Sequence, residues 1–317
     1  MSERMKVLIA YDGSECADAA LEDLRRAGLP PAVEAVVITA ADVYLPPSIN
    51  EGGEDTSTYV PEVIRRAHQH AARAVEEASE MAERAAARVK TSFPGWEVRS
   101  EAEADSPAWN VIKKADELGA DLIIVGAQGY NVLGGRLILG SVSQRVLYEA
   151  RSSVRVARHS KGRAAAHPLR LLIATDGSPD AEATVAAVAG RVWPPGSEAR
   201  LLCVLDTIME IKPAQGEPAI MRWVEAGNEE DIELLRKTLE PSAEKLRKAG
   251  LSVEVITAEG NPKSAIVEEA SQWDSDSIFI GAKGIRGIDR LLLGSVSAAV
   301  AARAHCTVEV VRPKSVS

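Results

Sequence analysis

Residues 121–141 read DLIIVGAQGYNVLGGRLILGS, and residues 276–295 return to the same pattern as DSIFIGAKGIRGIDRLLLGS. Each copy opens with a short apolar run rich in β-branched residues, which predicts a buried strand. The run ends at a glycine, Gly126 or Gly281, where the chain can turn sharply because glycine lacks a Cβ atom. The repeat predicts two similar domains of about 150 residues each, which is a usual domain size.

A helix is predicted to begin where each copy ends. The segment Gly-Ser-Val-Ser occurs at 140–143 and at 294–297 and leads into apolar residues at helical spacing, so Ser141 and Ser295 are expected to be N-caps. The first N–H groups of a helix are unpaired and carry positive partial charge, and nearby glycines let a ligand approach the main chain. This arrangement favours the binding of a phosphate group.

The other elements recur as well. Besides the apolar run before each first glycine, strands are expected at 5–11, 35–40, 96–103 and 154–157, and again at 169–175, 199–205, 253–258 and 308–311. With helices between the strands, this order predicts an α/β fold of two doubly wound domains, each a mostly five-stranded parallel sheet with helices on both faces. The domains are expected at 1–158 and 169–317, here called the first and second half, with a polar, alanine-rich linker at 159–168.

The first strand of each half ends in Asp-Gly-Ser, at 12–14 and at 176–178. Ser14 and Ser178 suit helix N-caps, and Pro179 suits a first helical position. Capping does not require the aspartate, which follows a strand and points toward the crevice where open α/β sheets bind ligands. A ligand contact and a purely structural turn both stay open for Asp12 and Asp176.

The composition narrows the possible partners. The net charge of −9 and the lack of a basic patch argue against a nucleic acid or an anionic membrane, since both need clustered Lys and Arg. The sequence has no signal-like apolar core and no run of about 18 apolar residues, so a soluble, cytoplasmic protein is expected. The three cysteines are isolated and the five histidines lack metal-ligand spacing, so no metal site made of protein side chains is expected.

The two copies resemble the signature of the universal stress protein family, which is Gly-x-x-Gly, nine residues, then Gly-Ser or Gly-Thr. The second copy fits it at Gly281, Gly284, Gly294 and Ser295. The first copy matches at Gly126, Gly129, Gly140 and Ser141, but ten residues rather than nine separate Gly129 from Gly140. The second site is therefore expected to bind a phosphate at least as well as the first.

The resemblance implies a tandem, two-domain universal stress protein of the ATP-binding type, with an adenine nucleotide α-hydrolase-like (Rossmann-like) fold in each half. In nucleotide-binding members the strand-end aspartate contacts the nucleoside. The positions that match nucleotide contacts are Asp12, Ala40, Gly126, Gly129, Gly140, Ser141 and Val142 in the first half, and Asp176, Val204, Gly281, Gly284, Gly294, Ser295 and Val296 in the second. ATP is the expected cofactor, with or without Mg²⁺ held by its phosphates. Four polar side chains in the loops could reach phosphates or serve only as surface charge: Gln128, Arg136, Lys283 and Arg290.

The expected function is regulatory, with nucleotide occupancy changing conformation or partner choice during stress. No general base and no metal-holding carboxylate pair is evident in the sequence, so fast phosphoryl transfer lacks its usual parts. A slow ATPase or autophosphorylating protein remains an alternative, as does a nucleotide-free scaffold that acts through its surfaces.

The last strands of the two halves are expected to pair with each other, because an unpaired edge strand promotes aggregation. Universal stress domains commonly pair in dimers, so the resemblance implies an intramolecular pseudo-dimer, and a further homodimer stays open. Alignment of the two Gly-Ser pairs places Arg155 and Glu309 at equivalent positions of opposite charge. Facing each other, they would favour this pairing slightly. Two unrelated, solvated charges are the alternative.

Overall fold

The computed structural model describes residues 4–43, 62–128, 139–159, 168–205, 229–284 and 293–313. The strands are β1 (Met5–Ala10), β2 (Val33–Ala41), β3 (Glu97–Ala104), β4 (Leu122–Gly126), β5 (Ser153–Ala157), β6 (Arg170–Ala174), β7 (Glu198–Leu205), β8 (Ser252–Glu259), β9 (Ser277–Gly281) and β10 (Thr307–Val311). The helices are α1 (Glu15–Asp23), α2 (Glu62–Ser92), α3 (Pro107–Leu118), α4 (Ser141–Glu149), α5 (Pro179–Ala189), α6 (Glu229–Lys248), α7 (Pro262–Gln272) and α8 (Ser295–Arg303), with a 3-10 turn η1 (Leu24–Arg26) after α1.

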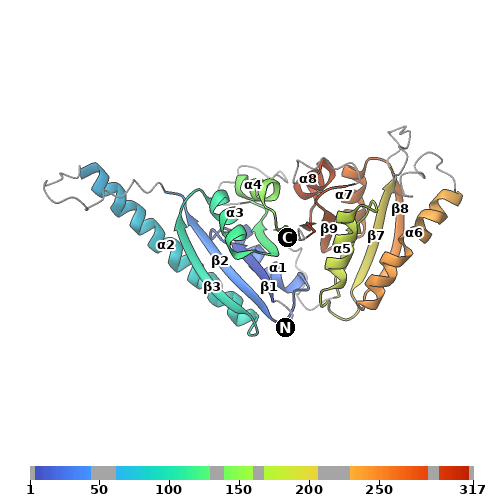
Figure 1. The fold of residues 1–317 in the computed structure, drawn as a ribbon, viewed down its shortest axis with the longest axis horizontal. Coiled ribbons are helices and arrows are strands. Elements are labelled where there is room, and N and C mark those ends of the chain that lie inside the picture. Colours follow the sequence, from blue (N-terminus) through green and yellow to red (C-terminus); the bar gives the residue numbers. More distant parts are fainter. Residues whose placement is uncertain are drawn as a thin grey trace.

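The two halves form one continuous sheet with their helices packed on its two faces (Figure 1). The strand order is β3-β2-β1-β4-β5-β10-β9-β6-β7-β8, so the second half repeats the order of the first in the reverse direction. Within each half all five strands are parallel. This is the doubly wound α/β architecture that the alternation of strands and helices predicts.

The central strands are buried on both faces, which explains why their sequences are continuously apolar. In β1 the three successive residues Val7, Leu8 and Ile9 are all fully buried. Leu8 belongs to a core under α3 and α4, whereas Val7 and Ile9 belong to a core under α1 and α2. Strands between two helical layers need no polar face, so the period-two alternation of half-exposed strands is absent from β1.

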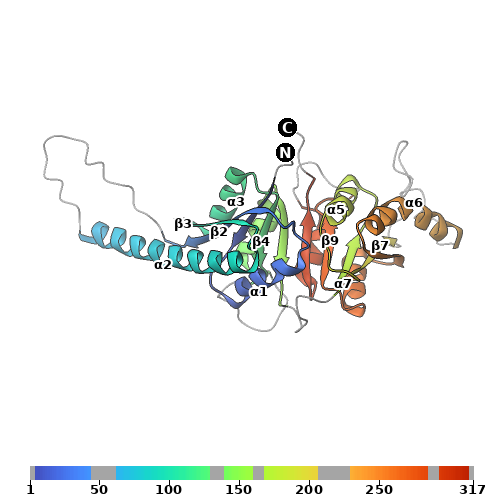
Figure 2. The ribbon, with the colours of Figure 1, turned by 90° about the horizontal axis from the view of Figure 1, so that it is seen from below.

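Helix α2 is amphipathic. Ala71, Ala78, Ala82, Ala85 and Val89 are buried at spacings of three, four and seven residues. The N-terminal part of the helix extends beyond the sheet in Figure 2. There Ile64 and Ala67, which continue the same spacing, are only partly buried. Only the C-terminal part of α2 therefore contributes to the core.

The halves meet where β5 and β10 pair in antiparallel register, and this boundary is called the seam. Arg155 lies directly opposite Glu309, as the alignment of the Gly-Ser pairs predicts. The alternative that these charges are solvated is wrong, because both side chains are fully buried. Arg155 Nη1 donates to Glu309 Oε2 at 3.1 Å.

Two further charges complete this buried network. Asp23, from the end of α1, accepts hydrogen bonds from the Arg155 guanidinium. Arg191, just after α5, donates Nη1 to Glu309 Oε2 at 2.9 Å and Nη2 to Glu309 Oε1. The ring of Phe279 lies under both guanidinium groups, at 5.7 Å from that of Arg155 and 5.3 Å from that of Arg191. Each half therefore contributes one acidic and one basic side chain, and each of these four charges has a neighbour of opposite charge.

Candidate functional site

The candidate sites lie at the point where the strand order reverses in each half. β1 lies between β2 and β4, so the chain passes from β1 to one side and later returns to the other. Asp12 follows the end of β1, and Gly126 ends the neighbouring β4. In the second half, Asp176 follows β6 and Gly281 ends β9. Open α/β sheets bind ligands at such a switch point, beyond the carboxyl ends of the strands.

The Asp-Gly-Ser turns build the start of α1 and α5. Ser14 and Ser178 are N-caps, as predicted, and their hydroxyls accept from the N–H groups of Ala17 and Ala181. Gly13 and Gly177 have φ near +73° and +74°, which glycine adopts without strain.

The turns also use the aspartates, which is the structural role left open for Asp12 and Asp176 by the sequence. Asp12 Oδ1 accepts from the Ser14 N–H at 3.0 Å and from its hydroxyl at 2.6 Å. Asp176 Oδ1 accepts from the Ser178 N–H at 3.0 Å. Asp12 is exposed and Asp176 is half-buried, and both lie at the carboxyl edge of the sheet. The aspartates thus have a structural role, and a ligand contact stays a prediction.

The first glycine of each motif has a packing role. A Cβ at Gly126 would lie 2.6 Å from the Cys16 carbonyl oxygen, and one at Gly281 would lie 2.9 Å from the backbone of Asp180. Only glycine lets the first turn of α1 or α5 approach the strand end this closely. These two glycines shape the site, and the close packing alone accounts for them.

The second glycine brings two predicted site residues of the second half together. A Cβ at Gly284 would lie 2.5 Å from Asp176 Oδ2, so the glycine loop passes directly over the aspartate. The corresponding Gly129, together with Arg136 and Arg290, lies outside the described residues.

The third glycine, rather than the serine after it, is the N-cap of the next helix. Gly140 and Gly294 have extended backbone angles at this position, and α4 and α8 begin at Ser141 and Ser295. The prediction that these serines are N-caps is wrong by one residue. Glycine has no side chain to cap the first turn, and no side-chain cap bond is found at either helix start. No N-cap side chain therefore competes with an anion for the first N–H groups of either helix.

The second serine of each Gly-Ser-Val-Ser segment ties the helix start to the glycine loop, and it was not among the predicted site residues. Ser143 Oγ donates to the carbonyl of Ala127 at 3.0 Å, and Ser297 Oγ donates to that of Ala282 at 2.8 Å. Both serines are 2% exposed. The occurrence of this serine in both copies is the feature by which the sequence could have identified it. Its role is to hold the loop against the helix.

Asp180 is a further residue that the sequence argument did not select. Its Oδ2 accepts from the Lys283 backbone N–H at 2.8 Å and so holds the glycine loop against α5. Alignment of the Asp-Gly-Ser turns places Cys16 at the equivalent position of the first half, where no carboxylate is available. An acidic residue in the first turn of a helix is common, so nothing in the sequence distinguished Asp180 from an ordinary helix start.

The remaining predicted contacts lie at the same edge. Ala40 and Val204, near the ends of β2 and β7, are half-buried, as are Val142 and Val296 in the first turns of α4 and α8. In both halves the parallel strands bring these residues to the edge that carries the aspartate and the glycines.

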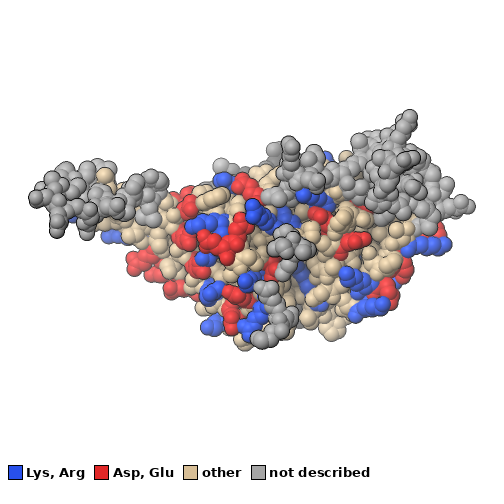
Figure 3. All heavy atoms as spheres, in the orientation of Figure 1, with Lys and Arg blue, Asp and Glu red and all other residues tan. Residues whose placement is uncertain are grey.

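Acidic and basic side chains are interspersed over the face shown in Figure 3. Within the described ranges, no helix is both long and apolar enough to cross a membrane. The same ranges contain no group of three or more His, Cys, Asp and Glu residues that could hold a metal ion.

Comparison with known proteins gives a consistent assignment. The universal stress protein family matches residues 3–158 and again residues 169–312. A universal stress protein of Mycolicibacterium smegmatis is 28% identical over 97% of each chain. Universal stress protein MJ0531 of Methanocaldococcus jannaschii is 34% identical over 109 residues, which are 33% of this chain and 61% of that protein. The crystal structure of a universal stress protein from Archaeoglobus fulgidus shares the fold, with a TM-score of 0.63, 20% identity and coverage of 97% of this chain and 98% of the other. The two successive matches, over a fold repeated in both halves, show that the chain is a tandem, two-domain member of the universal stress protein family.

Proposed function

We propose that the protein binds ATP or a related adenine nucleotide at the switch point of each half and acts as a regulator in the stress response. The functional units are residues 1–158 and 169–317, joined by residues 159–168. The observation that carries the proposal is in the second half, where Asp176, the Gly284 loop and the open start of α8 lie at one edge of the sheet.

The start of α8 suits the phosphates. Gly294 caps the helix without a side chain, and Ser295 presents an exposed hydroxyl at the first helical position. Backbone N–H groups of the first turn and the positive end of the helix dipole attract a polyanion. Any Mg²⁺ would be held by the phosphates themselves.

The strand-end residues suit the nucleoside. Asp176 offers a half-buried carboxylate beside the loop, and Val204 adds a half-buried apolar surface at the end of β7. A carboxylate oxygen can accept from a sugar hydroxyl, while an apolar side chain can pack on a base. Asp12 and Ala40 would do the same in the first half.

Binding without rapid turnover fits the groups at this edge. Backbone amides and small side chains hold charge but do not remove a proton from water, which general-base catalysis of hydrolysis requires. Occupancy of the site is then the signal, and a cytoplasmic location is expected for a protein that reads the nucleotide pool.

Isothermal titration calorimetry of the full-length chain with ATP tests the proposal. Cytidine triphosphate is the control for base recognition. We expect saturable ATP binding that Gly294→Val reduces, because a β-branched side chain would block the main chain at the start of α8. The absence of heat with ATP and of bound nucleotide in the purified protein would favour the scaffold alternative. Turnover abolished by the same variant would favour the ATPase alternative.

A further inference from the structure

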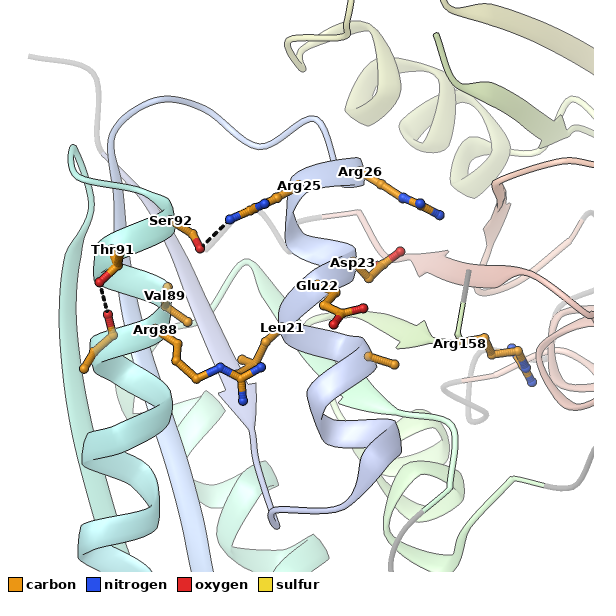
Figure 4. Close-up of a pocket in the computed structure, with 12 residues that line it drawn as sticks. Leu21, Glu22, Asp23, Arg25, Arg26, Arg88, Val89, Thr91, Ser92 and Arg158 are labelled. Carbon is orange, nitrogen blue, oxygen red and sulfur yellow. Dashed lines mark hydrogen bonds between the residues drawn. The ribbon is translucent and has the colours of Figure 1, made fainter. Parts of the chain in front are cut away.

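Two arginines occupy equivalent positions directly after the last strand of each half, and each reaches across the seam. Arg158 follows β5, and its Nη1 donates to the Cys306 carbonyl at 3.2 Å. Its Nη2 donates to the Ala301 carbonyl. Both acceptors belong to the second half. The Arg158 side chain in Figure 4 accordingly points away from α1 and toward the second half, at the side of a groove of about 650 Å³.

Arg312 makes the equivalent contacts from the second half to the first. Arg312 follows β10, and its Nη1 donates to the Ser152 carbonyl at 3.0 Å. Its Nη2 donates to the Leu147 carbonyl at 2.6 Å. The backbone N–H groups cross the seam too, from Arg158 to Thr307 Oγ1 at 3.2 Å and from Arg312 to Ser153 Oγ at 3.1 Å. Each of the three hydrogen bonds that Arg158 donates across the seam therefore has an equivalent hydrogen bond donated by Arg312.

One of the two carbonyls that each arginine contacts lies in the last turn of α4 or α8, and the other lies just after that helix. The N–H of Ala150 bonds to Val146, so the Leu147 carbonyl is the next one along α4. The N–H of Ala304 likewise bonds to Val300, which leaves the Ala301 carbonyl at the end of α8. The last carbonyls of a helix lack partners within it and carry negative partial charge. A glycine in left-handed conformation often satisfies them, but Ala150 and Ala304 are extended here, and a guanidinium from the opposite half takes that place.

Burial makes these hydrogen bonds costly to lose. Arg312 is 9% exposed, and within the described part of the chain neither arginine forms an ion pair with a carboxylate. Desolvation lowers the pKa of both guanidinium groups to about 10, with Asp180 opposing the shift at Arg312, so each stays charged at neutral pH while it is hydrogen-bonded to carbonyl groups. A buried cation needs such partners, and the helix ends supply them.

The same helices begin at the proposed phosphate sites. α4 starts after Gly140 and α8 after Gly294, and each helix has only nine residues. The residue before each arginine also contacts the glycine loop of its own half. The Ala157 carbonyl accepts from the Ala127 N–H at 2.9 Å, and the Val311 carbonyl accepts from the Ala282 N–H at 2.9 Å. One short segment thus contacts its own loop through the backbone and the opposite helix through the arginine.

We propose that Arg158 is a positioning residue for the second-half site and Arg312 for the first-half site, so that each half completes the binding helix of the other. The inference rests on the proposed nucleotide binding. A purely structural role at the seam would instead weaken both sites together, or mainly the site of the half that carries the substitution.

Full-length chains with one working site separate these outcomes. Gly140→Val leaves the second site, and Gly294→Val leaves the first. Into each we would introduce Arg158→Gln or Arg312→Gln and titrate ATP by calorimetry. We expect Arg158→Gln to weaken the second site by about three- to tenfold and to leave the first nearly unchanged, with the reverse for Arg312→Gln, as suits loss of a cation at a helix terminus. Arg158→Lys and Arg312→Lys, which keep the charge and a donor, should restore most of the affinity.

Equal losses at both sites, or a loss confined to the half that carries the substitution, would overturn the inference while leaving nucleotide binding intact. If the single-site chains bind no ATP, the proposed function fails instead. Hydrogen exchange then decides the positioning role by itself. Faster exchange in α8 but not α4 after Arg158→Gln, with the reverse after Arg312→Gln, supports it. Equal exchange of the two helices in both variants overturns it. The lysine variants keep this comparison usable if a glutamine variant does not fold.

Discussion

Gly284 faces the carboxylate of Asp176 so closely that any side chain at position 284 would displace it, because a Cβ would lie 2.5 Å from Oδ2. This contact ties the glycine loop to the strand-end aspartate. Ser295, in contrast, is exposed and contributes a single hydroxyl at the start of α8. Substitution of Gly284 therefore tests the main-chain part of the proposed site, and substitution of Ser295 tests a side-chain contribution.

Gly284→Val should nearly abolish ATP binding at the second site, since it obstructs the loop and moves Asp176. Ser295→Ala should weaken ATP by only about 0.5–1.5 kcal/mol, the usual worth of one neutral hydrogen bond. Calorimetric titration in the Gly140→Val background checks both, with circular dichroism to show that the fold is kept. A folded Gly284→Val chain with parental affinity would contradict this assignment.

The pH dependence of stability should report on Glu309. Burial opposes its ionisation, but Arg191 and Arg155 outweigh the burial and hold the pKa below the ordinary value of 4.5. A lowered folded-state pKa contributes stability that is complete above the unfolded-state pKa and is lost as the pH falls through the folded-state value. Glu309→Gln should therefore cost about 3–5 kcal/mol at neutral pH, because it removes the carboxylate charge that pairs with Arg191 and Arg155 and leaves Arg155 with Asp23 alone.

The difference between Glu309→Gln and the parent should begin to shrink below pH 4.5, where the unfolded parent binds a proton at Glu309 while the folded parent keeps the charge, and should be lost as the pH falls through the folded-state pKa. Denaturant titrations at a series of pH values measure it. Glu80→Gln is the matched control, since the Glu80 side chain is 64% exposed. A gap that stays constant down to pH 3 would show that the charge of Glu309 does not stabilise the fold.

At the scale of elements, the pairing of β5 with β10 depends on four charges rather than two. Arg155 and Glu309 face each other on the strands, while Asp23 and Arg191 come from the ends of α1 and α5. Asp23 also accepts from the Thr307 hydroxyl of the other half at 3.0 Å. The helices therefore help to hold the two strands in register.

Exchanging the two strand charges should consequently fail to restore stability. Arg155→Glu and Glu309→Arg alone should each cost about 3–5 kcal/mol as broken buried pairs. In the double variant the new carboxylate at 155 lies beside Asp23 and the new guanidinium at 309 lies beside Arg191, so the double should be no more stable than the milder single variant. Urea denaturation measures all three. A double variant with parental stability would mean that the strand pair acts alone.

The sequence was sufficient for the order of elements and for this strand register, since both follow from a repeat with well-separated anchors. It did not reveal that Arg155 and Glu309 are buried, because Asp23 and Arg191 lie far away in the chain and nothing local links them to the strands. The N-caps of α4 and α8 were misplaced by one residue for a different reason. Serine is usually the better cap, and here glycine takes the position and leaves the helix start open.

Within the sites, the glycines and aspartates could be found from the sequence because they occur at turn positions in both halves. Ser143, Ser297 and Asp180 could not be ranked in the same way, because each forms a tertiary hydrogen bond from a position that also suits an ordinary helix start. Residues that join two loops through space leave no periodic pattern in one sequence.

At the scale of the whole molecule, the two halves share a fold but differ in their sites. The second half has Asp180 on the Lys283 backbone and Asp176 against Gly284, whereas the first half has Cys16 at the position of Asp180 and an exposed Asp12. Ten residues rather than nine separate its second and third glycines. These differences predict that the second site binds a phosphate at least as well as the first.

Gly294→Val should therefore remove at least as much ATP binding as Gly140→Val. Each variant keeps the opposite site, so the affinity that remains in each chain reports one site. Titration of the two full-length variants under the same conditions measures the ranking. If Gly294→Val leaves most of the binding intact and Gly140→Val removes it, the ranking is reversed and the argument from Asp180 fails.

Native mass spectrometry of the purified full-length chain mixed with ATP is the most direct test of the central claim that this protein binds an adenine nucleotide. The account predicts that the parent chain carries bound ATP and that the double variant Gly140→Val with Gly294→Val, folded to the same extent, has lost it. A parent chain with the bare protein mass at saturating ATP, or a double variant that keeps the full adduct, would contradict the account.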